Sequence, residues 1–237
     1  MPTELRATEI VATIYRLEQR IGERFPGSGL SHIAAELLRV SEDASQRSES
    51  FRQPNTALRG LIGLLLVFIG GVLTYTATRL RFVDAAAWEV MEGIEAAISS
   101  LVFLGAAVIF LGTMESRLTR RRTLSAIQEL RELAHIVDMH QLTKDPETAL
   151  GTHVQTQSSP ARPVTPFLLG RYLDYCTELL SLIGKVAVFY IHGVHDSAIL
   201  AAVDNVEALT TGLSRKIWQK IMILNAVDGS DHDPSVR

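Results

Sequence analysis

The chain has 237 residues, of which 47% are hydrophobic and 21% charged, and its formal net charge is −3. A slightly acidic chain lacks the basic footprint of a nucleic-acid-binding protein, and a single cysteine excludes an internal disulfide. The apolar residues gather in a few stretches, so their order along the chain is more informative than the average composition.

The first 52 residues carry two helical patterns. Apolar residues recur mostly at steps of three and four, which predicts one amphipathic helix: Leu5, Ile10, Ile14, Leu17 and Ile21. The stretch FPGSG then breaks the pattern, and a second helix is predicted from Ser31 to about Arg52. We expect residues 1–52 to form cytoplasmic N-terminal helices.

Two uncharged stretches of nineteen residues follow, one between Arg59 and Arg79 and one between Glu95 and Glu115. Each meets the length that a helix rising about 1.5 Å per residue needs to cross a hydrocarbon core about 30 Å thick. We therefore expect a transmembrane hairpin over residues 53–116, with spans at about 58–78 and 96–114 joined by a loop at 79–95.

Basic residues flank this hairpin on one side. Arg47, Arg52 and Arg59 precede the first span and RLTRRR, residues 117–122, follows the second, whereas the loop carries four acids against two arginines. Basic flanks resist translocation. Both termini are therefore expected in the cytoplasm, with the loop outside, in a bacterial-type inner (plasma) membrane.

The second half of the chain is also helical in pattern. No glycine or proline interrupts residues 113–145, so a cytoplasmic stalk helix is predicted over 117–151. Residues 152–165 read as a flexible linker rich in Ser, Thr and Pro, 166–225 as a cytoplasmic helical hairpin and 226–237 as a disordered tail.

The second helix of that hairpin has a seam typical of a coiled-coil-like pair. Its members recur at steps of four and three: Ile199, Val203, Val206, Thr210, Leu213, Ile217, Ile221 and Leu224. No strand pattern appears, so the predicted fold class is all-α: a two-span helical membrane protein with a cytoplasmic helical bundle or stalk.

The stretch WEVMEG, residues 88–93, stands just before the second span. It resembles the pore segment of the mitochondrial calcium uniporter family, whose second span begins with an outward-facing Trp-Asp-x-x-Glu-Pro motif. Trp88 and Glu92 match that motif, Glu89 replaces its aspartate, and Gly93 replaces its proline. The resemblance implies a Ca²⁺-type cation channel in which Glu89 and Glu92 form coordinating rings.

A simpler reading of the same residues stays open. Carboxylates in the opening turns of a helix are favoured by the macrodipole, and Trp88 is typical of the aromatic belt at a membrane interface.

A second set of polar residues, His135, Asp138 and His140, consists of types that bind divalent metals. His135 and Asp138 share a helix face and His140 does not, so a metal site would need a further ligand from another segment. The alternative is hydrogen bonding near a helix end at Pro146. No catalytic motif is present, so no catalytic residue is assigned, and the one cofactor considered is a divalent cation.

A third set lies on one face of the helix predicted from Pro166: Arg171, Asp174, Glu178 and Lys185. This face is suited to a small anionic ligand or a partner protein. A solvated face, or a network in which Arg171 meets Asp174 or Glu178, is the alternative. The basic stretch SRKIWQK around Trp218 is suited to headgroups or a partner, while Ile217 and Ile221 within it read as core.

These patterns lead to three hypotheses. The first is a membrane-anchored, homo-oligomeric scaffold or sensor whose cytoplasmic helices bind a partner protein or ligand. The second is the uniporter-like cation channel, and the third is a membrane-associated enzyme that uses His135, Asp138 and His140. The expected partners are the lipid bilayer, further copies of the chain and a cytoplasmic protein, and not nucleic acid.

Overall fold

The computed structural model describes residues 6–51, scattered positions from 60 to 74, residues 87–144 and 146, and residues 165–191 and 196–230. The regular elements in these ranges are all helices and none is a β-strand, which confirms the predicted all-α class. The chain divides into two units, Met1–Phe51 with Thr123–Arg237, and Arg52–Arg122. The first unit is a helical bundle.

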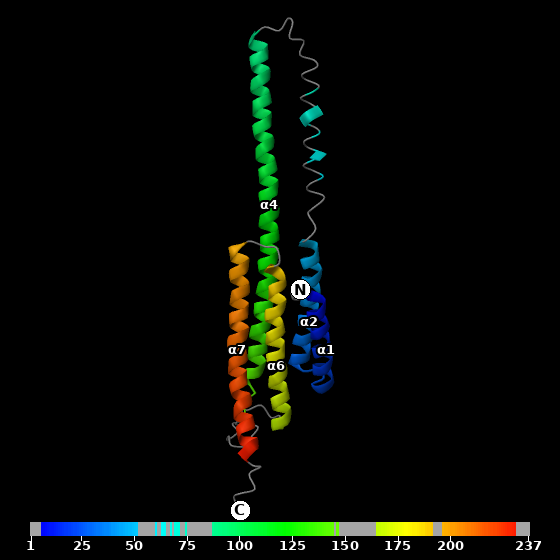
Figure 1. The fold of residues 1–237 in the computed structure, drawn as a ribbon, viewed down its shortest axis with the longest axis vertical. Helices are drawn as coiled ribbons and strands as arrows, with labels where there is room; N and C mark the ends of the chain where they lie inside the picture. The colour runs from blue at the N-terminus through cyan, green and yellow to red at the C-terminus, as the bar shows by residue number, and fades with distance from the viewer. Residues whose placement is uncertain are drawn as a thin grey trace, which may run out of the picture. The chain divides into compact units, whose positions relative to one another are not determined.

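The bundle begins with a helical hairpin of α1 (Ala7–Arg24) and α2 (Gly29–Phe51), shown in Figure 1. Gly27 adopts a positive φ of 64° in the connection, a conformation that glycine reaches without steric cost. Ser28 then caps α2, because its Oγ accepts a hydrogen bond from the Ser31 N–H at 3.2 Å. The predicted apolar stripe of α1 is buried from its second member onward: Ile10, Ile14, Leu17 and Ile21.

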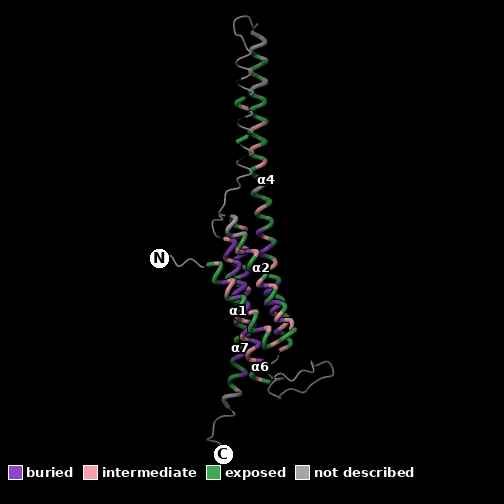
Figure 2. The backbone as a smooth tube through the Cα atoms, turned by 90° about the vertical axis from the view of Figure 1, so that its right-hand side faces the viewer, coloured by how far each residue is buried: buried purple, intermediate pink, exposed green. Residues whose placement is uncertain are grey.

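The longest element is α4 (Ala87–Leu142), a single helix of 56 residues with two different kinds of surface. Residues 98–114 have no buried member (Figure 2). Phe103, for example, is 78% exposed. From residue 123 onward one face is buried in the bundle core: Ala126, Ile127, Leu130, Leu133, Ala134 and Val137.

The second half of α4 differs from the isolated stalk helix that was predicted over residues 117–151. The helix ends at Leu142, and its last turns supply part of the bundle core instead of standing apart from it. Sequence periodicity alone does not separate the two arrangements, because a stalk with an apolar seam and a bundle helix carry the same pattern.

Within the described ranges, one helix, from Ile98 to Leu142, contains a stretch long and apolar enough to cross a membrane. Most of the predicted first span, residues 58–78, lies outside the described residues. The two-span hairpin therefore remains a prediction. Residues 87–95 of the predicted loop at 79–95 already belong to α4, while the rest of that loop and residues 152–164 of the predicted linker at 152–165 lie outside the described residues.

The bundle is completed by α6 (Pro166–Ala187), a short 3₁₀ turn η1 (Val188–Ile191) and α7 (Ser197–Ser230). Thr165 caps α6, since its side chain accepts from the Leu168 N–H at 3.3 Å, and Pro166 occupies the first turn. Asp196 caps α7 through the N–H of Ala198 at 2.8 Å.

The most extensive helix contact is that between α6 and α7, which run side by side in Figure 1. All eight predicted seam residues of α7, from Ile199 to Leu224, are buried. The helix continues to Ser230, inside the segment 226–237 predicted to be disordered, and no glycine or proline lies between Gly212 and Gly229 to end it earlier.

Polar contacts join α4 to its neighbours in the bundle. Arg39 of α2 donates to Glu129 of α4 at 2.6 Å and to Glu36 at 2.7 Å, and the hydrogen bond to Glu36 holds the pKa of that carboxyl below its usual range. On another side, the Lys220 ammonium of α7 donates to the carbonyl oxygens of Gln141 at 3.0 Å and Lys144 at 3.3 Å. The end of α4 is thereby attached to both helical hairpins.

If residues 123–142 belong to the core, a cavity at Leu130 must cost far more than the same substitution at an exposed site of α4. Leu130 is 0% exposed and Leu142 is 64% exposed. We expect Leu130→Ala to lower the free energy of unfolding by about 2–5 kcal/mol and Leu142→Ala to change it by less than about 0.5 kcal/mol. Denaturation of the detergent-solubilised chain, followed by circular dichroism, measures both, and equal effects would contradict the assignment.

Candidate functional site

The charged face of α6 is divided between two neighbours. Arg171 donates to the Asp174 carboxylate at 3.1 Å, one turn away, and Glu178 accepts from both terminal nitrogens of Arg20 on α1, at 3.1 and 3.4 Å. Lys185 instead donates to the Ser181 hydroxyl at 2.6 Å and faces α7. Of the four residues proposed as one ligand face, Arg171 and Lys185 therefore line two separate hollows, and Asp174 and Glu178 line neither of them.

The smaller hollow lies between α1 and α6 and has a volume of about 230 Å³. Tyr175, almost fully buried, forms part of its wall, and the guanidinium carbons of Arg20 and Arg171 lie 5.2 and 5.3 Å from its ring centroid. Arg24 and Glu23 complete the lining. Because Arg20 and Arg171 each already hold a carboxylate, this hollow is close to charge balance.

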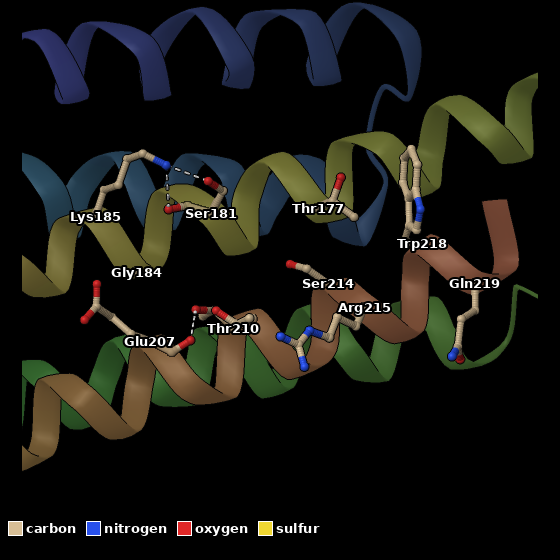
Figure 3. Close-up of a pocket in the computed structure, with 11 residues that line it drawn as sticks. Thr177, Ser181, Gly184, Lys185, Glu207, Thr210, Ser214, Arg215, Trp218 and Gln219 are labelled. Atoms are coloured by element: carbon tan, nitrogen blue, oxygen red, sulfur yellow. Dashed lines mark hydrogen bonds between the residues drawn. The ribbon is translucent and has the colours of Figure 1, made fainter. Parts of the chain in front are cut away.

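The larger hollow is a groove between α6 and α7 with a volume of about 870 Å³ (Figure 3). Small and hydroxyl-bearing residues make up most of its lining: Thr177, Ser181 and Gly184 from α6, and Thr210, Thr211 and Ser214 from α7. Two cations, Lys185 and Arg215, one carboxylate, Glu207, and the residues Trp218 and Gln219 complete it. We refer to this feature as the α6–α7 groove.

The floor of the α6–α7 groove is a close approach of the two helices. A methyl group at Gly184 would lie 3.3 Å from the Thr210 hydroxyl, and both residues are buried. The Thr210 hydroxyl donates to the Glu207 carbonyl at 3.1 Å, so it is satisfied within its own helix. The floor is thus small and rigid, and the polar side chains stand along its rims.

Two residues of the groove have no polar partner in the described structure. Trp218 is 58% exposed, and among the described residues its side chain makes no hydrogen bond, ring stacking or cation–π contact; Arg215 likewise makes no ion pair or hydrogen bond with a described residue. In Figure 3, Trp218 stands at one end of the groove and Lys185 at the other, with Arg215 between them.

The three α4 residues proposed as metal ligands, His135, Asp138 and His140, do not converge on a common metal site. Among the described residues no three His, Cys, Asp or Glu side chains are placed to share a metal ion. Asp138 accepts from the Gln141 amide at 2.7 Å, His140 packs against Gly29 of α2, and His135 is exposed. Gln141 itself is buried and its Oε1 has no partner, the one buried side-chain oxygen or nitrogen in the described residues of which this is true.

Glu89 and Glu92 lie in the first turns of α4, which begins at Ala87. Their side chains and that of Trp88 lie outside what the structure describes. Both acids precede the exposed apolar stretch of the same helix, and their role as coordinating rings remains a prediction.

The buried end of α6 holds two groups with perturbed acidity. Burial raises the pKa of the Cys176 thiol to about 12, against which Lys144 and Lys220 act weakly, and burial also raises the pKa of the Tyr172 hydroxyl above its usual range. Phe25 packs edge-to-face on Tyr172 with ring centroids 5.4 Å apart. A thiol of this kind stays protonated at neutral pH, so it is not a ready nucleophile.

The sequence pointed to part of the groove, since Ser214, Arg215, Trp218 and Gln219 lie in the basic stretch SRKIWQK, but it did not single out Glu207 and Thr211. One signal was present, because Glu207, Thr211, Ser214 and Trp218 recur at steps of four, three and four, one position beside the buried seam of α7. This second row of residues is found in the sequence only if Ser and Thr are counted together with apolar residues when the helical period is sought. Nothing local identifies Arg20 and Arg24, which reach the smaller hollow from α1.

No protein-family model matches the chain, and no curated protein and no solved structure resembles it at a significant level.

The burial of Cys176 predicts how this single thiol responds to a labelling reagent. Its raised pKa and its enclosure should make reaction at pH 8 at least about a hundredfold slower in the native chain than in the denatured chain, since access requires opening of the core. A thiol-reactive dye added to the detergent-solubilised protein measures the rate. In a Cys176→Ala background, Ser181→Cys places the thiol on the exposed rim and should react rapidly; fast labelling of native Cys176 would contradict its burial.

Proposed function

We propose that the chain is a membrane-anchored, homo-oligomeric scaffold or sensor that presents a helical module to the cytoplasm. The observation that carries the proposal is the change of surface along α4. Residues 98–114 expose large apolar side chains, whereas one face of α4 from residue 123 onward is packed into the bundle core.

The exposed stretch is too apolar for water. Val102, Phe103, Ile109 and Phe110 are each about two-thirds exposed or more, and they form two pairs about two turns apart on one helix. Leaving such side chains in water costs about 25 cal/mol for each Å² of apolar surface, and contiguous patches of this kind mark membrane or protein contacts. A bilayer covers the whole circumference of the helix, which a single partner helix does not.

Two neighbouring features support this placement. The arginines of RLTRRR, residues 117–122, follow the apolar stretch directly and suit the cytoplasmic headgroup level. Gly105 and Gly112, seven residues apart on one face, have nothing within 4 Å of an added methyl group. Small residues at such spacing allow helices to approach closely in a membrane, which supports association of several copies.

The topology can be tested with reporter fusions. A reporter after residue 86 should be active only outside, and one at the C-terminus only in the cytoplasm. Phe103→Arg combined with Ile109→Arg should move the C-terminal reporter outside, because each arginine at the centre of a span opposes insertion by about 2.5–3.5 kcal/mol. The control, Leu200→Arg with Ile223→Arg, changes exposed apolar residues of α7 and should leave the reporter in place. A cytoplasmic signal from residue 86 would refute the anchor as drawn.

A cation channel is the second candidate, favoured by the position of Glu89 and Glu92 on α4 immediately before its apolar stretch. If these carboxylates coordinate the ion, Glu92→Gln should abolish Ca²⁺ flux into proteoliposomes. Glu95 lies about 120° from Glu89 around a helix of 3.6 residues per turn, so Glu95→Gln is the matched control and should retain flux. Flux that is absent, or equal in all variants, would exclude the channel.

A further inference from the structure

The α6–α7 groove has the size and the chemistry of a small-molecule site. Ligand pockets typically enclose about 300–1,000 Å³, and the groove measures about 870 Å³. Five hydroxyl side chains line it, of which Thr177 and Thr210 already donate to carbonyl oxygens of their own helices and so offer a bound molecule only acceptor positions. The five are Thr177, Ser181, Thr210, Thr211 and Ser214.

The charges in the groove favour an anion. Lys185 and Arg215 stand against the single carboxylate of Glu207. The Lys185 ammonium is held in place by the Ser181 hydroxyl at 2.6 Å and the Ser181 carbonyl at 3.4 Å, and Arg215 keeps all its guanidinium donors unused by described residues. A guanidinium with free N–H groups is well matched to a phosphate, which it can bind through two parallel hydrogen bonds.

The exposed indole adds a second requirement. Trp218 presents its ring at one end of the groove without any described aromatic or cationic neighbour. Aromatic side chains stack on the flat faces of nucleobases, and stacking of this kind is worth about 1–3 kcal/mol per base. A ligand that joins a flat ring to phosphate groups satisfies both ends of the groove at once.

A helix from another protein fits the groove less well. Helices dock into grooves through apolar anchors, and the centres of protein interfaces are depleted of charged residues. The α6–α7 groove has hydroxyls and charges at those positions. A second copy in parallel orientation, as a shared membrane requires, would place Glu207 near Glu207 and Arg215 near Arg215, which repels.

We infer that the α6–α7 groove binds a nucleoside diphosphate, with the base stacked on Trp218 and the phosphates held by Arg215 and Lys185. Two separated cations suit two phosphate groups, and the hydroxyl of Thr177, which lies on the side of Trp218 in Figure 3, suits the ribose, whereas Glu207 lies at the Lys185 end of the groove. This inference deepens the proposed function and rests on it, since it names the ligand class of a cytoplasmic sensor module.

Trp218 itself reports on the groove. The chain has two tryptophans, so Trp88→Phe leaves Trp218 as the sole indole emitter in the detergent-solubilised full chain. Titration with ADP, GDP, CDP and UDP should quench its fluorescence saturably for at least one of them, at half-saturation below about 1 mM. The matching nucleoside, and pyrophosphate alone, should bind at least tenfold more weakly, because each satisfies one end of the groove only.

Substitutions then test the assigned residues. Arg215→Gln and Lys185→Gln should each weaken binding by tenfold or more, whereas Lys216→Gln, an exposed cation on α7 that does not line the groove, should not change it. Circular dichroism verifies that each variant is folded. The inference falls if none of the four nucleotides quenches saturably, if the nucleoside alone binds equally well, or if Arg215→Gln behaves like Lys216→Gln.

The same titration separates the groove from other occupants and from the anchor. If Trp218 emission changes with protein concentration and no ligand, a second copy occupies the groove and the inference is overturned. Binding in detergent does not depend on topology. Failure of the reporter assay with intact nucleotide binding would therefore refute the anchor alone, and loss of binding with correct topology would refute the groove assignment alone.

Discussion

The burial of α6 on several sides is the constraint on which the bundle depends. Twelve of its 22 residues are buried, and it contacts α1, α2, η1 and α7. A helix enclosed in this way has little surface left for polar groups. Those it keeps lie at its two edges: Glu178 reaches Arg20 of α1, and Ser181 and Lys185 line the groove toward α7. The two hollows described above are therefore both built on this extensively buried helix.

The elements that the sequence predicted well are those encoded by local periodicity. The apolar residues of α1 and the eight seam residues of α7 recur at helical spacing, and burial follows directly from that pattern. The partner of each buried face is not encoded locally. Residues 123–142 looked like a stalk because Ile127, Leu130 and Val137 repeat with the same period in a stalk and in a bundle.

The sequence predicted only part of the candidate site, because helical spacing shows which residues share a face but not which helix packs against that face. Arg171, Asp174, Glu178 and Lys185 share one face of α6, as their spacing indicates, but spacing does not say which neighbouring helix that face meets. The pairing of Arg20 with Glu178 joins residues 158 positions apart, and no local signal predicts it. Trp218 attracted attention as an aromatic residue among cations, whereas the hydroxyl residues around it have no periodic signature in a hydropathy pattern.

The structure of α7 explains why a groove forms beside a tightly packed seam. Thr210 sits in the seam and on the floor of the groove at once, and Gly184 opposite it lets the two helices approach closely. A larger residue than glycine at 184 would press on the Thr210 hydroxyl and move the helices apart, so the depth of the groove depends on that contact. If the rims of the groove were apolar, they would form a docking surface for another helix. The rims instead carry hydroxyl groups, two cations and an exposed indole, which suit the polar, anionic ligand with a flat ring that we propose. The two helices α6 and α7 thus pack closely through buried residues on one side and expose a polar, solvent-accessible groove on the other.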